Sequence, residues 1–365
     1  MSSYLEQNTS QKKQVEFKPQ VVNDSLEFWL EYYLQMTIIG VRSEGIEKKI
    51  QMHLERFKNY FINIYSHDKI SSCVKRDVLE WQRSMKQSGL AHSTINNHMA
   101  HLSGFFSWVE SKAPDTLANG NPCRGVSELG LPPLEPRALS EDQIRSLKNV
   151  CDRLERFHQL KGRRHVKFDE SKVHNLRRPL RDRAIVFTLL CTGLRREELV
   201  KVNLSQVSPC TPEELRNARK AKIGSVQGKG KTERVVFLSN DARMALADYI
   251  EKERIHDTSE DSTKLFLSAR DIPVRQVDGR MSPRSINDIL KQIGQWHDSE
   301  MKDPSRKISP LCPHDLRHTF AFQLAKVTGA DAYELERRLG HRSQRYIQRY
   351  TNPPEDVAAR YVEEL

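Results

Sequence analysis

The sequence is poor in cysteine, and its cysteines are not arranged for a metal site or a disulfide framework. Only six cysteines occur in 365 residues, and no two of them form a CxxC pair. The 13 histidines do not form a spaced cluster with them either, so no zinc site is indicated. We therefore expect reduced thiols and a cytoplasmic protein.

Long apolar runs are also missing. No stretch approaches the length of a membrane-spanning segment, and the N-terminus lacks the apolar core of a signal peptide. The chain contains no internal repeat and no low-complexity tract. These absences predict a protein without membrane contact. The length of the chain allows two domains, each with its own core.

Positive charge is what the sequence has in excess. The chain carries 59 lysines and arginines against 48 acidic residues, which gives a formal net charge of +11. Lysine and arginine neutralise phosphate groups and drive association with nucleic acids, so a polyanionic partner is favoured. Charge alone is equally typical of a basic but otherwise ordinary cytosolic protein.

Hydrophobic periodicity divides the chain into regions. Residues 1–22 are polar and are expected to form a flexible arm. Over 23–126, apolar residues recur in four stripes at helical spacing, which predicts a compact helical bundle. Three prolines in 127–139 predict an extended linker. The region 140–365 mixes helices with a little strand, so we expect a mainly α fold with a small β-sheet.

The second region contains several local structure signals. A buried helix is predicted over 184–190, and Gly193 is suited to end it. Residues 222–226 and 234–238 flank a Gly-Lys-Gly-Lys turn and predict a β-hairpin. Asn240 is expected to cap the helix that follows. Further helices are expected at 140–154, 285–293, 319–327 and 331–339.

Two arginines are suited to binding a phosphodiester, because a guanidinium donates paired hydrogen bonds and stays charged. Arg195 follows a Gly-Leu break and is expected at a helix end. Arg317 lies one turn after His314, so both share a helical face. Such a pair would stabilise charge on a reacting phosphate without a metal. Glu198 could orient Arg195, although either arginine alone is more often part of a surface ion pair.

A lysine and a late tyrosine could complete this chemistry. The Gly-Lys-Gly turn could bring an ammonium to a leaving oxygen as general acid, although basic hairpin tips are usually just solvated. Tyr350, nine residues after His341, could attack phosphorus to form a covalent phosphotyrosine. A tyrosine near a C-terminus is more often a packing residue. Tyr346 is a rival nucleophile on the same helical face, and the spacing from His341 separates the two.

Three ordered blocks, TGLRREEL, HDLRHTFA and LGHRSQRYIQRYT, resemble those of the tyrosine recombinases, the phage integrase family. The hairpin GKGKTERVVFL matches the family's lysine block, and the resemblance extends over 25–365. It implies a site-specific recombinase that grips duplex DNA in a two-domain, C-shaped clamp. A helical, SAM-like core-binding domain at 23–126 and a catalytic domain at 140–365 would form that clamp.

The resemblance implies how the scissile phosphate is held. Arg195 and Arg317 would bind the phosphate directly. His341 would donate a hydrogen bond to it, and Glu198 would brace the site. His314 would assist proton transfer from the nucleophile.

The resemblance also implies the covalent steps. Tyr350 would attack phosphorus and leave a 3′-phosphotyrosine and a free 5′-hydroxyl, which then attacks the partner duplex. Lys229 would protonate the leaving 5′ oxygen. Lys231 is an alternative, because the second lysine of this turn lies one place earlier than in the family pattern. No ATP, metal or other cofactor would be required.

The expected partners are double-stranded DNA with inverted-repeat core sites and further copies of the chain, a dimer on one site and a tetramer in the synapse. The last residues, 355–365, have the apolar spacing of a short amphipathic helix. That helix either docks on a neighbouring subunit, which the resemblance favours, or folds back on its own domain.

Two stretches are longer than the family pattern, and several alternatives stay open. Residues 155–183 form either an added DNA-contacting loop or a solvated insertion, and 296–310 has no assigned role.

A type IB topoisomerase shares the chemistry, and a non-catalytic DNA-binding relative is a third possibility. Integration or excision of a transposon or phage is slightly favoured over chromosome-dimer resolution.

Overall fold

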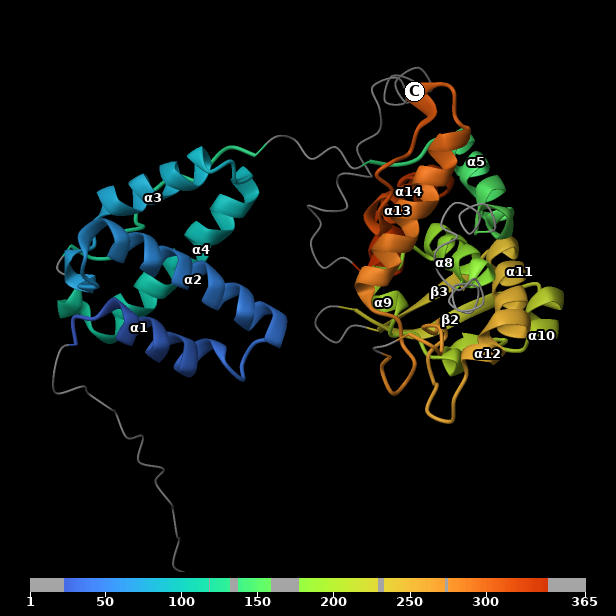
Figure 1. The fold of residues 1–365 in the computed structure, drawn as a ribbon, viewed down its shortest axis with the longest axis horizontal. Coiled ribbons are helices and arrows are strands. Elements are labelled where there is room, and N and C mark those ends of the chain that lie inside the picture. Colours follow the sequence, from blue (N-terminus) through green and yellow to red (C-terminus); the bar gives the residue numbers. More distant parts are fainter. Residues whose placement is uncertain are drawn as a thin grey trace, which may run out of the picture. The chain divides into compact units, whose positions relative to one another are not determined.

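The computed structural model describes residues 23–117, 119–131, 137–158, 177–228, 233–272 and 275–340. The chain divides into two compact units, Met1–Leu134 (unit 1) and Glu135–Leu365 (unit 2) (Figure 1). Among the described helices, none has the length and apolarity needed to cross a bilayer. The assignment of an arm, a core-binding domain, a linker and a catalytic domain to the predicted ranges stays a prediction.

Unit 1 is built from helices, and each predicted apolar stripe lies on one of them. The π-helical turn Leu34–Ile38 continues the first helix, and short 3₁₀ turns lie at Ile70–Ser72 and Pro114–Thr116. The α-helices are α1 (Leu26–Tyr33), α2 (Glu44–Tyr65), α3 (Lys75–Gln87) and α4 (His92–Lys112). The predicted helical region is therefore confirmed.

Aromatic rings fill the core of unit 1. Phe57 of α2 packs edge-on against Trp81 of α3, with ring centroids 5.0 Å apart, and against Phe106 of α4 at 6.0 Å. All three rings are buried. Full burial of one large apolar side chain stabilises a fold by about 1.5–3 kcal/mol, so these contacts join α2, α3 and α4.

Unit 2 combines helices with one small sheet, as the fold class predicts. The strands β1 (Val207–Ser208), β2 (Ala221–Gln227) and β3 (Glu233–Leu238) pair antiparallel in that order. The longer helices are α5 (Glu141–Cys151), α8 (Pro179–Thr192), α11 (Asn240–Tyr249), α13 (Pro283–Glu300), α14 (Pro313–Thr328) and α15 (Ala332–Leu339). Shorter helices are α9 (Arg196–Leu199), α10 (Pro212–Asn217) and α12 (Ile255–Asp257), with 3₁₀ or π turns at Leu204–Gln206, Ile250–Arg254 and Pro304–Arg306.

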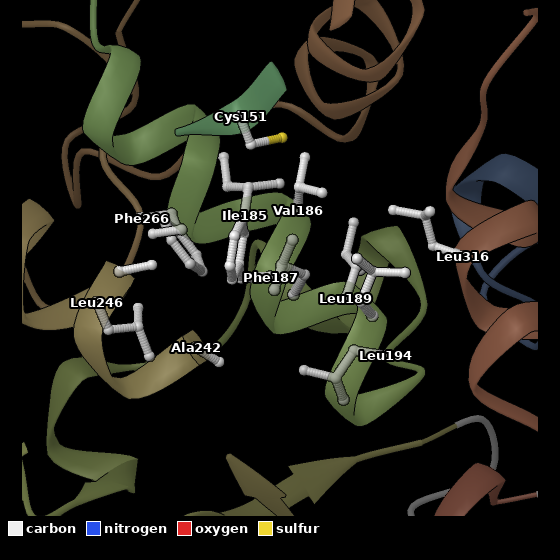
Figure 2. Close-up of a cluster of buried hydrophobic side chains, with 14 of the residues drawn as sticks. Cys151, Ile185, Val186, Phe187, Leu189, Leu194, Ala242, Leu246, Phe266 and Leu316 are labelled. Carbon is white, nitrogen blue, oxygen red and sulfur yellow. The ribbon is translucent and has the colours of Figure 1, made fainter. Parts of the chain in front are cut away.

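Helix α8 lies at the centre of the unit 2 core. Its side chains are buried on nearly every face, as expected for a helix that is apolar all round. Figure 2 shows Ala242 and Leu246 of α11 on one side of α8 and Leu316 of α14 on the other. Helix α14 therefore packs against a buried central helix, and α9 follows directly from the end of that helix.

The end of α8 requires glycine for two reasons. Gly193 has the left-handed φ of +60°, which side chains rarely adopt. A Cβ at this position would also clash with the ring of Phe320 on α14. The prediction that Gly193 ends the helix is confirmed, and the close contact brings the α8–α9 turn against α14.

The hairpin strands are confirmed, whereas one predicted cap is wrong. Strands β2 and β3 pair where the hairpin was expected, and its tip at 229–232 lies outside the described residues. The cap of α11 is Ser239, whose hydroxyl accepts from the Ala242 amide. Ser239 has the extended backbone of a cap, while Asn240 is already helical and accepts from the Arg243 guanidinium.

The region around 296–310 extends α13 and then turns back towards α14. Helix α13 continues to Glu300, beyond the predicted end at 293. The Asp298 carboxylate accepts from the backbone amides of Ile308 and Ser309, at 2.8 and 3.0 Å. Of the other long stretch, 155–183, residues 159–176 lie outside the described residues.

Candidate active site

A pocket of about 510 Å³ in unit 2 brings together three of the predicted site residues, Arg195, His314 and Arg317. They come from the α8–α9 turn and the first turns of α14. The remaining lining residues are Arg196, Glu197, Asn287, Asp288, Lys291, Pro310, Leu311, Cys312 and Pro313. Among the described lining residues, arginine and lysine outnumber acidic residues four to two, so the pocket favours an anion.

Arg195 lies at the N-terminal cap of α9, so the expectation that it emerges at a helix end is confirmed. Its backbone amide donates to Glu198 Oε2 at 2.8 Å, and its Nη1 donates to Glu198 Oε1 at 2.9 Å. Glu198 therefore holds both the backbone and the guanidinium of Arg195. The structure places Glu198 against Arg195, while its part in the reaction stays a prediction.

Glu198 is ionised although it is only 6% exposed. Burial raises the pKa of its carboxyl, but the hydrogen bonds and charges of Arg234 and Arg195 outweigh that effect and hold the pKa below its usual value. Two guanidinium groups thus share one buried carboxylate. A charged Glu198 at neutral pH keeps Arg195 in a defined orientation beside the pocket.

Arg317 reaches the pocket from within the core of unit 2 and is only 3% exposed. Its Nη1 donates to the Gly193 carbonyl at 2.5 Å, and its Nη2 donates to the Leu339 carbonyl at 2.6 Å. These carbonyls end α8 and α15, so one guanidinium satisfies two helix termini. Arg317 is consequently held in place by backbone groups.

His314 lies on the first turn of α14 and is a neutral imidazole at pH 7. Partial burial, together with the positive charges of Arg317 and Arg195, lowers the pKa of His314. A neutral imidazole can accept a proton, as transfer from a nucleophile requires. His314 and Arg317 line the same pocket, in agreement with the predicted shared helical face.

The other predicted site residues lie outside the described part of the chain. Lys229 and its alternative Lys231 belong to the hairpin tip between β2 and β3. His341 directly follows Gly340, which ends α15 with a φ of +64°. Tyr350 and the tail 355–365 are also outside the described residues.

Sequence reasoning missed two residues of this region. Arg234 lies on β3 with Val236 and Leu238 on the buried face of the strand. The alternation along β3 places Arg234 on the buried face, and a buried charge needs a partner. This pattern was therefore a signal that Arg234 binds an acidic group. Lys291 lines the pocket from α13. The helix around it was predicted, but its periodicity does not show which face meets α9 and α14.

Comparison with known proteins identifies relatives of the chain. Residues 164–356, more than half of its length, match the model of the phage integrase family. The tyrosine recombinase XerC of Syntrophus aciditrophicus is 30% identical over 263 residues, which cover 71% of this chain and 69% of that protein. XerC of Thermodesulfovibrio yellowstonii is 27% identical over 268 residues, covering 72% of each.

Solved structures share the fold. The Tn1549 transposon integrase, in complex with a circular intermediate DNA, superposes with a TM-score of 0.66 at 16% identity. The match covers 94% of this chain and 100% of that chain. The relatives are recombinases and integrases, so the topoisomerase alternative is not favoured.

Proposed function

Because the chain belongs to the phage integrase family and is a DNA-binding, site-specific tyrosine recombinase, we propose that it cuts and rejoins duplex DNA through a 3′-phosphotyrosine formed by Tyr350. The observation that supports this chemistry is the convergence of Arg195, His314 and Arg317 on one cationic pocket. A phosphodiester is the anion that such a wall fits, since its non-bridging oxygens match the guanidinium donors.

The two arginines stabilise the reacting phosphate. Negative charge grows on its non-bridging oxygens as the nucleophile adds, and donors held in advance at those oxygens lower the barrier. Arg317 is held by two backbone carbonyls and Arg195 by the Glu198 carboxylate. Neither guanidinium has to be reorganised when charge develops. His341 adds a further hydrogen bond to the phosphate.

Proton transfers accompany the bond changes. The Tyr350 oxygen bonds to phosphorus while the bond to the 5′ oxygen breaks, and neutral His314 assists removal of the tyrosine proton. Lys229, or Lys231, donates a proton to the leaving 5′ oxygen. A 5′-hydroxyl of the partner duplex then attacks and releases Tyr350. Each step exchanges one phosphate ester for another, so the scheme needs no ATP or metal.

We further propose that residues 23–126 and 140–365 close around the duplex as a clamp joined by 127–139. One dimer would occupy an inverted-repeat site, and a tetramer would form the synapse. The tail 355–365 would dock on the neighbouring subunit, so its deletion should impair synapsis more than binding to a single site. The DNA complex of the Tn1549 integrase supports a role in mobile-element integration or excision. The protein would act in the cytoplasm, on chromosomal and mobile-element DNA.

A nicked duplex that carries a candidate site from the flanking genome tests the nucleophile, because loss of the short strand traps the covalent intermediate. Wild-type protein and Tyr346→Phe should form a covalent adduct with it, and Tyr350→Phe should form none. The Tyr346→Phe variant is the matched control, since it removes a hydroxyl one helical turn away. An adduct with Tyr350→Phe but not with Tyr346→Phe would refute the assignment.

A further inference from the structure

Arg234 carries a buried positive charge inside a β-strand. The side chains of β3 alternate, and Arg234 is 8% exposed on the same face as Val236 and Leu238. It does not line the pocket of Arg195 and Arg317, so its guanidinium does not face an anion bound there. Burying a guanidinium is costly unless it is fully paired, and its partners therefore indicate what it does.

All three guanidinium nitrogens of Arg234 donate hydrogen bonds. Nη1 and Nη2 bind the two oxygens of Glu198, at 3.1 and 2.6 Å, and Nε binds the Arg338 carbonyl at 2.9 Å. The paired bonds to Glu198 set the plane of the carboxylate as well as its position. One side chain of β3 is thereby tied to both α9 and α15.

The hydrogen bonds between Arg234 and Glu198 determine where Arg195 lies. The Glu198 oxygens that accept from Arg234 are the same two that accept from Arg195, one from its guanidinium and one from its backbone amide. With Arg234 removed, Arg195 would be the only charged partner left to Glu198 in the described part of the chain. The guanidinium would then be drawn towards the buried carboxylate and away from the pocket.

The hydrogen bond from Arg234 to the Arg338 carbonyl positions the end of α15. Arg234 binds the Arg338 carbonyl, and Arg317 binds the next carbonyl, that of Leu339. Gly340 follows with a φ of +64°, and a Cβ there would lie 3.1 Å from Arg234 Nη1. Two arginines thus hold consecutive carbonyls of the backbone that leads into His341.

We propose that Arg234 is a positioning residue for DNA cleavage, one that sets Arg195 through Glu198 and sets the backbone before His341 through Arg338. This inference rests on the proposed function. It adds to that function a group that never contacts DNA but couples two phosphate-binding residues through β3. Arg234 acts on the rate of cleavage and not on the affinity for the site.

The test compares Arg234→Met with Arg254→Met in the full-length protein. Arg254 is a matched control, because it is 7% exposed in the same unit and also holds backbone carbonyls, those of Lys264 and Leu265. It does not line the pocket. Thermal unfolding would show a loss of stability in both variants. Adduct formation on the nicked duplex and the dissociation constant for the same duplex would then be measured below both unfolding transitions.

We expect Arg234→Met to form the adduct about 10- to 100-fold more slowly, the range found when a supporting residue misplaces a reacting group. Its dissociation constant for the duplex should be unchanged. Arg254→Met should keep the wild-type cleavage rate in its folded fraction. Arg234→Lys should recover part of the rate, because an ammonium can still donate to Glu198.

The pH profile separates positioning from a loss of stability. Burial raises the pKa of Glu198 and the Arg234 guanidinium lowers it, so Arg234→Met should raise that pKa. Cleavage by Arg234→Met should therefore fall further as pH decreases. This added pH dependence should vanish in Arg234→Met combined with Glu198→Gln, whose side chain does not titrate.

The outcomes distinguish the inference from the function on which it rests. Wild-type cleavage by Arg234→Met, or an equal loss in Arg254→Met, would overturn the positioning role and leave the recombinase chemistry intact. If wild-type protein formed no adduct although it bound the duplex, both would be wrong. A slower rate with the added pH dependence supports the inference.

Discussion

Unit 1 and unit 2 bury different kinds of side chain. Among the described residues of unit 1, the core is aromatic and aliphatic, and neither arginine nor lysine is buried. Unit 2 has an apolar core of its own around α8. The described residues of unit 2 also include five buried arginines, namely Arg181, Arg234, Arg243, Arg254 and Arg317.

The difference shows how the second unit holds irregular backbone. Arg317 binds carbonyls at the ends of α8 and α15, and Arg254 binds carbonyls of the segment after α12. Apolar packing cannot satisfy such groups, whereas a guanidinium offers up to five donors. Unit 1 is thus stabilised mainly by packing, while unit 2 uses buried charge to position a site. Substitutions in the core of unit 1 should therefore affect stability alone, whereas substitutions of the buried arginines that position the pocket of unit 2 should also affect the chemistry.

The largest effect is expected for Arg317→Met. It removes a guanidinium from the pocket and leaves the Gly193 and Leu339 carbonyls without this donor. Adduct formation on the nicked duplex should slow by roughly 100- to 1,000-fold, as when one preorganised donor is lost. The unfolding temperature should also fall, because unpaired buried carbonyls are costly. If Arg317→Met cleaved at the wild-type rate, the buried arginine of unit 2 would not contribute to the chemistry, and the proposed contrast with unit 1 would be wrong.

Phe57→Ala is the corresponding change in unit 1. Loss of this buried ring should cost about 3–5 kcal/mol of unfolding free energy, because Phe57 contacts both Trp81 and Phe106. The folded fraction should cleave bound DNA at the wild-type rate. Denaturant unfolding gives the first quantity, and the nicked duplex gives the second. Slower cleavage by folded Phe57→Ala would show that the unit 1 core contributes to the chemistry.

A smaller effect concerns three histidines between α2 and α4. The rings of His53 and His98 stack with centroids 3.6 Å apart, and His53 Nδ1 lies 2.9 Å from His101 Nδ1. Burial, then the charges of the other two histidines, lowers the pKa of His53 from 6.5 to about 4. The pKa values of His98 and His101 are lowered as well, in both cases chiefly by burial. Lys49 and Arg56 add positive charge beside them.

Unit 1 should consequently lose stability at mildly acidic pH. The folded pKa of His53 lies below its unfolded value, so the unfolded state binds more protons between about pH 6.5 and 4. The contribution is complete above pH 6.5 and declines as pH falls towards 4. Three of the four tryptophans lie in unit 1, so fluorescence of a Trp296→Phe variant reports its unfolding. A midpoint that stays constant from pH 7 to 5 would contradict this prediction.

Local sequence patterns were sufficient to predict most of the helices and strands. Apolar periodicity located α1 to α4, and the two segments that flank the Gly-Lys-Gly-Lys turn located β2 and β3. The motif residues Arg195, His314 and Arg317 were found from their local spacing and meet at one pocket. The error at Asn240 arose because adjacent Ser239 and Asn240 are both good caps, and only backbone geometry decides between them.

The role of Arg234 could not be predicted in the same way. Its carboxylate partner lies 36 residues away, and its carbonyl partner lies 104 residues away. No spacing rule relates such positions, since their distance depends on how β3, α9 and α15 pack together. Residue order was enough to specify the chemistry of this recombinase, because that chemistry needs particular side chains in particular motifs. Which buried charges share a carboxylate was decided by the tertiary structure, because hydrogen bonds require contact in space.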